Sequence, residues 1–172
     1  MKLVMVRHTR IAVPPGICYG QTDVPVYETF PEEAAAVREK LAGWVPDRVY
    51  TSPLGRCVSL AGFCGYPDAV WDDRLKELHF GEWENHPWDE LDMSVWETDW
   101  IGNPPPGGES FVQMYERVSG FLDELKTKSI NTALVFTHGG VINCARIYFG
   151  QNTFEDVFDR MSEYGQVWEF EL

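Results

Sequence analysis

Two apolar segments, each followed directly by a histidine, constrain the fold of this chain more than any other feature. Residues 3–6 form the first segment, and Arg7 and His8 follow it; residues 132–137 form the second, and His138 follows it. Short apolar runs rich in β-branched residues are typical of strands buried in a parallel sheet. Ligands of open α/β sheets bind outside the carboxyl ends of the strands. The pattern therefore predicts that both histidines lie at one edge of a sheet and face a common site.

Strands and helices alternate along the rest of the chain. Cap residues at Thr29, Ser52 and Ser110 predict three helix starts, and a later apolar run predicts a fourth helix over residues 141–149. Further strands are expected over residues 48–51, 69–71 and 166–172, the last of them at an edge. We therefore predict an α/β three-layer sandwich with a mostly parallel central sheet, organised as a single domain over residues 1–172.

The composition narrows the partners and the compartment. The chain has 27 acidic and 14 basic residues, for a formal net charge of -13. This balance argues against nucleic acid or an anionic membrane surface as partner, because both are bound through clustered lysine and arginine. The start of the chain lacks the apolar core of a signal peptide, and no apolar run approaches the roughly 20 residues of a membrane span. We expect a cytoplasmic protein whose four cysteines are reduced.

Arginine and histidine side chains lie at the ends of three strands that we expect to lie side by side, those ending at His8, Thr51 and Thr137. Their shared edge gathers Arg7, His8, Arg56 and His138. Guanidinium groups donate paired hydrogen bonds to phosphoryl or carboxylate oxygens, and a helix starting at Gly139 adds backbone N–H donors for an anion. Histidine is a nucleophile toward phosphorus, and neighbouring guanidiniums lower its pKa and keep it unprotonated.

Transfer of a phosphoryl group also needs an acid that protonates the leaving oxygen. Glu77 is the first candidate and Glu82 the second, since both stand in the loop that follows the third predicted strand. His79 and His86 lie near several carboxylates, but their spacing matches no familiar metal-ligand pattern, and we expect them to be solvated loop residues.

Four motifs support a family resemblance. They are Arg7-His8 after a strand, Ser52-Pro53-Leu54-x-Arg56, Arg74-Leu75-x-Glu77 ahead of Phe80-Gly81-x-Trp83-Glu84, and Thr137-His138-Gly139-Gly140. These motifs span nearly the whole chain. Their order and spacing resemble those of the histidine phosphatase superfamily, also called the phosphoglycerate mutase-like superfamily. The resemblance implies a phosphoglycerate mutase-like fold and a phosphomonoester hydrolase that acts on a small phosphorylated substrate without a cofactor.

The resemblance also implies a role for each matching residue. His8 would be the nucleophile that becomes phosphohistidine, and Arg7 and Arg56 would bind the phosphoryl oxygens. His138 would hold a phosphoryl oxygen, and Glu77 would protonate the leaving alcohol and later activate water. No metal would be required, because the cationic cluster supplies the electrostatic stabilisation.

The segment after His8 departs from the family pattern. The family usually has Gly, then Glu or Gln, then Thr, whereas this chain has Thr9, Arg10 and Ile11. Thr9 is a candidate phosphate contact in place of the usual glycine. Arg10 either adds a positive charge to the pocket or faces solvent.

The loop of residues 18–25, Cys-Tyr-Gly-Gln-Thr-Asp-Val-Pro, is similar to that of bacterial α-ribazole phosphatases. Those enzymes remove the 5′-phosphate from α-ribazole phosphate or from the cobalamin phosphate. Tyr19 and Gln21 either contact the substrate or order this loop, and we favour contact because the loop directly follows the nucleophile.

Other functions fit parts of the same pattern. Alternatives are a phosphoglycerate mutase, a broad-specificity phosphatase and a non-catalytic phospho-ligand-binding protein. Mutases of the family tend to carry longer insertions and a tail that closes the site, so hydrolysis is expected here. A binding protein needs the arginines but not a nucleophile and an acid together. The pattern is compatible with a monomer or a homodimer.

Overall fold

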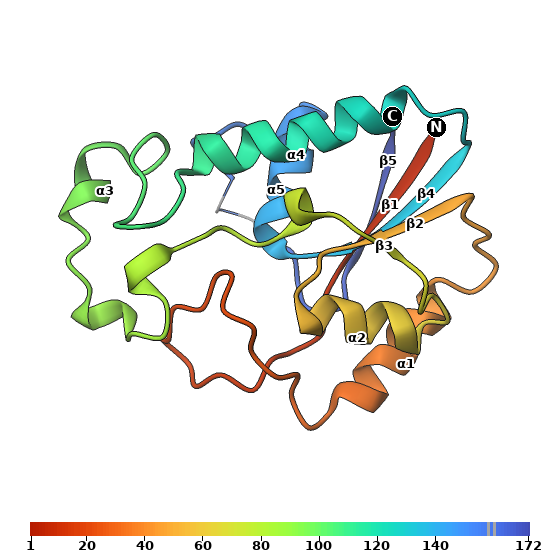
Figure 1. Ribbon diagram of the computed structural model, residues 1–172, viewed down its shortest axis with the longest axis horizontal. Helices are drawn as coiled ribbons and strands as arrows, with labels where there is room; N and C mark the ends of the chain where they lie inside the picture. Colours follow the sequence, from red (N-terminus) through yellow and green to blue (C-terminus); the bar gives the residue numbers. More distant parts are fainter. Residues whose placement is uncertain (158, 160) are drawn as a thin grey trace.

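The computed structural model describes residues 1–157, 159 and 161–172, and its centre is a five-stranded sheet. The strands are β1 (Lys2–Arg7), β2 (Arg48–Thr51), β3 (Val70–Trp71), β4 (Thr132–Thr137) and β5 (Val167–Glu171). They lie in the order β3-β2-β4-β1-β5, and each neighbouring pair is parallel except β1 with β5 (Figure 1). The predicted mostly parallel sheet with an edge strand near the last residues is confirmed.

The register of the central strands brings the two histidine segments level. Arg7 at the end of β1 pairs with Thr137 at the end of β4, so His8 and His138 leave the sheet side by side. The backbone N–H of His8 donates to the carbonyl oxygen of Thr137 at 3.0 Å. On the other side of β4, the parallel strand β2 ends at the same level. Three carboxyl ends therefore meet at one edge, as the sequence predicts.

Helices cover both faces of the sheet. They are α1 (Phe30–Lys40) and α2 (Gly55–Phe63) on one face, and α4 (Phe111–Lys126) and α5 (Gly139–Tyr148) on the other (Figure 1). Successive strand residues point to opposite faces, so Val4 and Val6 join the core under α1 and α2, whereas Leu3 and Met5 join the core under α4 and α5. The predicted three-layer sandwich is confirmed.

An aromatic segment extends from the sheet edge that carries the histidines. It contains the 3₁₀ turns η1 (Asp73–Leu75), η2 (Gly81–Trp83) and η3 (Trp88–Glu90) and the helix α3 (Ser94–Asp99). The rings of Trp83 and Trp96 pack at 4.8 Å between centroids, and the backbone N–H of Trp88 donates to the carbonyl of Gly16 at 2.8 Å. The loop that follows β1 therefore lies against this segment, at the end of the molecule where α3 is drawn in Figure 1.

The helix start at Ser110 is confirmed in its details. The N–H of Gln113 donates to Oγ of Ser110 at 3.2 Å, and the N–H of Ser110 donates to Oε1 of Gln113 at 2.8 Å. These reciprocal bonds satisfy two N–H groups that a helix start otherwise leaves unpaired.

The helix start predicted at Thr29 is confirmed, but its side-chain cap is wrong, and both the start and the cap predicted at Ser52 are wrong. Thr29 precedes α1, but its hydroxyl donates to Glu33 and caps no helix N–H group. Helix α2 begins at Gly55 after the uncapped Leu54, and the hydroxyl of Ser52 turns toward the site instead.

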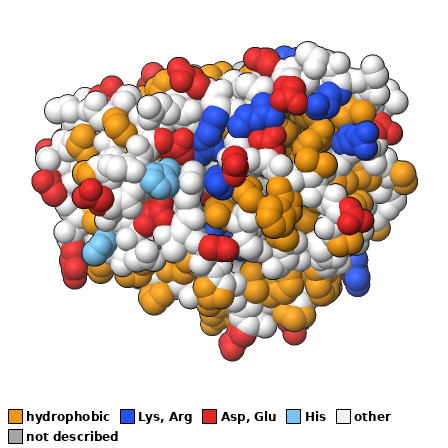
Figure 2. Space-filling model, viewed as in Figure 1, with side chains coloured by type: hydrophobic (Ala, Val, Ile, Leu, Met, Phe, Trp, Pro, Cys, Tyr) orange, Lys and Arg blue, Asp and Glu red, His pale blue; other side chains and the backbone are white. Residues whose placement is uncertain are grey.

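Acidic side chains are distributed over the visible face of the molecule, in keeping with the net charge of -13 (Figure 2). Within residues 1–157, 159 and 161–172, no helix is long and apolar enough to cross a membrane.

Candidate active site

The two predicted histidines form the centre of the site. The rings of His8 and His138 lie 5.1 Å apart between centroids, inclined at 63°, and both side chains are essentially buried. Their closeness follows from the parallel pairing of β1 with β4, because each histidine is the first residue after its strand.

The imidazole of His8 is fixed in one tautomer. Its Nδ1 lies 2.7 Å from the carbonyl oxygen of Thr9. A carbonyl oxygen can only accept, so Nδ1 carries the proton and Nε2 of the neutral ring keeps its lone pair. Burial, then the guanidinium of Arg56 and, more weakly, that of Arg7, hold the pKa of His8 well below its ordinary value. The ring is therefore neutral at physiological pH.

Two guanidiniums reach the histidines from different layers. Arg7, at the end of β1, donates through Nη1 to the carbonyl of Ser162 and stacks 4.1 Å from the ring centre of Tyr164. Arg56, in the first turn of α2, is 1% exposed and donates to the carbonyls of Gly20 (2.7 Å) and Thr22 (3.0 Å).

Each of these guanidiniums keeps a buried donor unused. The Nε atoms of Arg7 and Arg56 are buried and have no hydrogen-bond partner among the described residues. An unpaired buried donor is costly, so two of them beside an imidazole mark a place where an anion can bind.

His138 is held by the segment that follows β2. Its Nε2 lies 2.8 Å from Oγ of Ser52, and Sγ of Cys57 in α2 stands 3.5 Å from the same nitrogen. Burial, then the charge of Arg56 and, more weakly, those of Arg7 and Arg117, lower the pKa of His138 well below its ordinary value. This second ring is therefore also neutral.

Glu77 faces the histidine edge from the loop after η1. Its Oε2 accepts the N–H of Gly140 in the first turn of α5 at 3.2 Å, and Oε1 accepts the N–H of Leu78 at 3.0 Å. The alternative acid, Glu82, is exposed and lies beside Gly107. Of the two predicted carboxylates, the structure brings Glu77 to the site.

The loop after the nucleophile supplies one pocket residue and one brace. Tyr19 lines the cavity, its ring centre lies 5.5 Å from the guanidinium carbon of Arg56, and its hydroxyl lies 3.3 Å from that of Tyr164. Gln21 orders the loop, since its side-chain amide donates to the carbonyl of Glu77 at 3.0 Å. Gly139 opens α5, where an added Cβ would stand 3.3 Å from the guanidinium carbon of Arg7.

Of the two residues that depart from the family pattern, Thr9 is buried and Arg10 is exposed. Thr9 is fully buried, and its hydroxyl has no partner among the described residues. Arg10 is exposed and pairs with Glu33 at 2.7 Å, while its Nη2 donates to Thr29 at 3.1 Å. Of the two alternatives for Arg10, the structure supports the exposed one.

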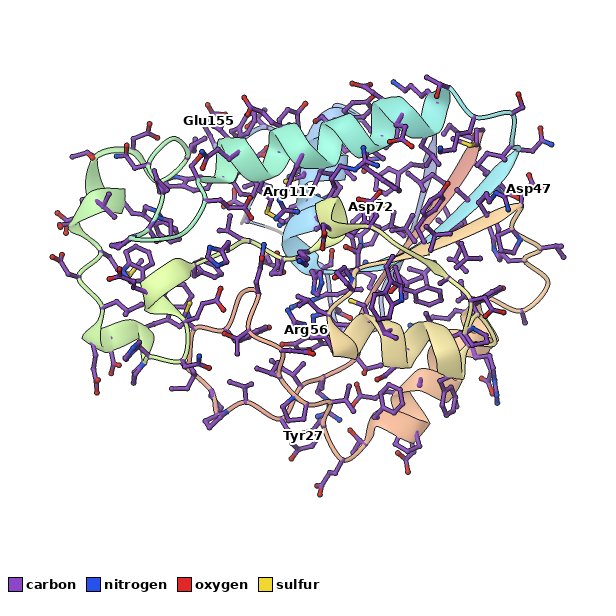
Figure 3. The ribbon with its side chains drawn as sticks, viewed as in Figure 1. Tyr27, Asp47, Arg56, Asp72, Arg117 and Glu155 are labelled. Atoms are coloured by element: carbon purple, nitrogen blue, oxygen red, sulfur yellow. The ribbon has the colours of Figure 1, made fainter. Side chains whose placement is uncertain are left out.

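Three residues of the site have a position that no local pattern of the sequence indicates. Arg117 of α4 donates to the carbonyl of Glu77 at 3.1 Å. Tyr164, whose ring lies 5.6 Å from that of His8, covers the nucleophile candidate. Ser52 belongs to one of the four motifs, but its spacing predicts a helix cap instead of a partner for His138. Figure 3 shows Arg56 and Arg117 entering the site region from the α2 and α4 sides.

A cavity of about 280 Å³ opens beside Arg7 and Glu77. Its other walls are chiefly apolar and aromatic, and include Ile17, Tyr19, Leu78, Phe80, Trp88, Trp96, Phe111, Met114 and Met161. The cavity can therefore bury an apolar group attached to a phosphate next to the Arg7 guanidinium. Among the described residues, no three His, Cys, Asp or Glu side chains are grouped to hold a metal ion.

A family model described as "Histidine phosphatase superfamily (branch 1)" matches residues 3–171, so this chain belongs to that superfamily. The fold and the pair of histidines flanked by arginines agree with this membership. The chain is thus a member of a family of phosphatases and phosphoglycerate mutases that act on small phosphorylated substrates.

Individual relatives carry several activities in their names. The chain is 29% identical to a "Putative phosphoserine phosphatase 2" of Hydrogenobacter thermophilus, over 83% of this chain and 75% of that protein. It is 31% identical to a "Glucosyl-3-phosphoglycerate phosphatase" of Mycolicibacterium vanbaalenii, over 82% of this chain and 70% of that protein. The crystal structure of a phosphoglycerate mutase from Thermus thermophilus superposes with a TM-score of 0.77 at 29% identity, over 97% of this chain and 91% of that one.

Proposed function

We propose that this protein is a phosphomonoester hydrolase that transfers the phosphoryl group of its substrate to Nε2 of His8 and then to water. The observation that carries the proposal is the state of that imidazole. Its Nδ1 is engaged by the Thr9 carbonyl, its pKa is lowered, and two guanidiniums with unused donors lie beside it. A neutral imidazole next to fixed positive charge is suited to attack an anionic phosphate.

Two steps complete the reaction. In the first, the bond from phosphorus to Nε2 of His8 forms and the bond to the ester oxygen breaks, while protonated Glu77 gives its proton to the departing oxygen. In the second, Glu77 takes a proton from water, the water oxygen attacks phosphorus, and the P–N bond breaks. The guanidiniums of Arg7 and Arg56, with His138, stabilise the charge on the phosphoryl oxygens, so no metal ion is invoked.

Substitution of the nucleophile tests the mechanism. We expect His8→Ala to abolish phosphate release, whereas His86→Ala, which removes an exposed histidine, should leave it unchanged. Rapid quenching of the wild-type enzyme should trap a phosphoenzyme that is absent from His8→Ala, and EDTA should not slow turnover. Near-normal hydrolysis by His8→Ala would refute the mechanism. Binding of phosphate with no turnover by the wild type would favour a non-catalytic binding protein.

The acid role of Glu77 has its own test. Protonation matters for a poor leaving group and little for an activated one. We expect Glu77→Gln to lower kcat/KM for an alkyl phosphate by about 10²-fold or more, in the range of general acid catalysis, and to spare 2,4-dinitrophenyl phosphate. Equal losses on both substrates would show that Glu77 is not the acid.

We also propose that the leaving group carries a flat, apolar ring, and that the substrate is α-ribazole 5′-phosphate or the corresponding cobalamin phosphate. The aromatic cavity wall supports this choice: Trp88 and Trp96 line the same cavity as Glu77, and both can stack on an aromatic base. The loop of residues 18–25 supports it as well. The names of the relatives instead favour phosphorylated hydroxy acids.

A substrate panel separates these alternatives. Phosphate release from α-ribazole 5′-phosphate should exceed release from O-phosphoserine, glucosyl-3-phosphoglycerate and simple sugar or nucleotide phosphates. Even rates over the panel would indicate a broad-specificity phosphatase and remove the α-ribazole assignment. Conversion of 3-phosphoglycerate to its 2-isomer without net phosphate release would indicate a mutase.

A further inference from the structure

Arg117 of α4 takes no part in the chemistry proposed above, yet every N–H of its guanidinium is engaged. The group has five N–H donors. Nε donates to Oε2 of Glu109 at 2.9 Å, and Nη2 donates to Oε1 at 2.5 Å, which is a two-point pairing with one carboxylate. The other three donors go to backbone carbonyls. A fully used guanidinium holds all its partners in one plane and is geometrically demanding.

The three carbonyls belong to the segment that presents Glu77. Arg117 donates through Nη1 to the carbonyls of Arg74 (2.7 Å) and Lys76 (2.8 Å), and through Nη2 to that of Glu77 (3.1 Å). Residues 76–80 follow η1 and belong to no helix or strand. Backbone groups here lack a regular ladder, so a side chain has to satisfy them. The side chain of Arg117 therefore supplies the hydrogen bonds that a neighbouring strand would supply in a sheet.

Glu109 extends the bracing to the other side of Glu77. Its Oε1 accepts the N–H of His79 at 3.0 Å while it pairs with Arg117. One ion pair therefore bonds the backbone on both sides of Leu78: Arg117 at the carbonyl of Glu77 and Glu109 at the N–H of His79. The side chains of Arg117 and Glu109 are each 18% exposed, so their pairing is only partly screened by solvent. Asp72 and Arg117, both labelled in Figure 3, lie close to this segment on its α4 side.

We propose that Arg117, together with Glu109, is a positioning residue that holds the Glu77 carboxyl over the N–H of Gly140 and toward the leaving group. The inference rests on the acid role proposed for Glu77. The Arg117 side chain does not line the cavity beside Arg7 and Glu77, and it acts through the backbone of residues 74–77. Proton transfer demands a heavy-atom separation within hydrogen-bond reach. A loop that drifts by about 1 Å therefore costs about 10²-fold in the step that needs the acid.

The test compares two leaving groups in matched variants. We expect Arg117→Gln to lower kcat/KM for an alkyl phosphate by about 10²-fold and to leave kcat/KM for 2,4-dinitrophenyl phosphate almost unchanged. Arg117→Lys, which keeps the charge beside Glu109 but not the planar fork, should give an intermediate loss with the same selectivity. Arg38→Gln removes an exposed guanidinium of α1, which lies 5.2 Å from the ring centre of Phe63 and away from this segment, and it should spare both substrates.

The double variant of Arg117→Gln with Glu77→Gln tests whether Arg117 acts through Glu77. If Arg117 acts only through Glu77, then Arg117→Gln should add almost nothing to the alkyl phosphate loss of Glu77→Gln. Thermal unfolding of each variant shows whether it is folded at the assay temperature. If Arg117→Gln does not fold, Glu109→Gln and Arg117→Lys carry the same test, because each loosens the brace and keeps part of it.

The outcomes separate this inference from the proposed function. Equal losses on both substrates in the Arg117 variants, or no loss on either, would overturn the positioning role while a selective loss in Glu77→Gln leaves the acid role intact. Equal losses in Glu77→Gln itself would overturn the acid role, and this inference with it.

Discussion

The two buried histidines predict that the protein loses stability as the pH falls below about 6.5. Burial, Arg56 and Arg7 lower the pKa values of both His8 and His138. In the unfolded chain a histidine titrates near its ordinary value of about 6.5. Between the folded and the unfolded pKa, the unfolded state therefore binds protons that the folded state does not. The free energy of unfolding then rises with pH and falls on acidification.

The magnitude follows from linkage. Each histidine that stays neutral in the folded protein contributes a slope of about 1.4 kcal/mol per pH unit once the pH is well below its unfolded pKa. Acidification from about pH 6.5 to about pH 5 therefore costs at most about 2 kcal/mol for each ring, and at most about 4 kcal/mol for His8 and His138 together. This is a large part of the stability of a typical domain.

Urea unfolding at several pH values between about 5 and 7.5 measures the slope. Buffers should contain no phosphate, because an anion bound at the guanidiniums would stabilise the folded state. His8→Gln and His138→Gln should each remove about half of the slope, whereas His86→Gln serves as the exposed control. A wild-type stability that is flat over the acidic half of this range, or a slope unchanged in both variants, would refute the reasoning.

Two further perturbations follow from the packing. In Gly140→Ala the new Cβ would overlap Oε1 of Glu77 and stand 3.0 Å from Cε of Met114, so the carboxylate must move. We expect kcat/KM for alkyl phosphates to fall by about 10²-fold without loss of thermal stability. The control is Gly120→Ala, whose Cβ would meet no atom within 4 Å and which should be active. Full activity of Gly140→Ala would contradict the placement of the acid. In Arg56→Lys, the lysine side chain cannot bond to both carbonyls of loop 20–22 and also present a planar fork to the phosphate. We expect this variant to have a lower melting temperature and a kcat/KM lower by at least about 10²-fold. Wild-type kinetics would contradict the role of Arg56 in binding the phosphoryl group.

Much of the site could be read from the sequence, because its chemistry stands directly after strands. His8 and His138 each follow an apolar run, and parallel strands deliver their carboxyl ends to one edge. The buried periodicity of the strands and the capping box at Ser110 are local features, determined within a few residues. That locality is why the three layers and the neighbouring positions of β1, β2 and β4 were predictable.

Local rules were misleading where a polar side chain had a better partner elsewhere in the fold. Ser52 has the hydroxyl of a good helix cap, but His138, 86 residues further along the chain, takes this hydroxyl. Gln21, predicted as a substrate contact, donates to the Glu77 carbonyl, 56 residues further along the chain. A hydroxyl or amide bonds to whatever the packed structure brings near, and sequence spacing alone does not rank these partners.

The sequence by itself determined the sheet, the order of its elements and the reactive side chains that follow the strands, because periodicity and strand ends are properties of short segments. Only the tertiary structure decided how these groups are held. Arg7 reaches the carbonyl of Ser162 across 155 residues of chain, and Arg117 braces Glu77 across 40 residues. Such contacts form when helices pack onto the sheet, and no local pattern encodes which distant carbonyl a guanidinium will meet.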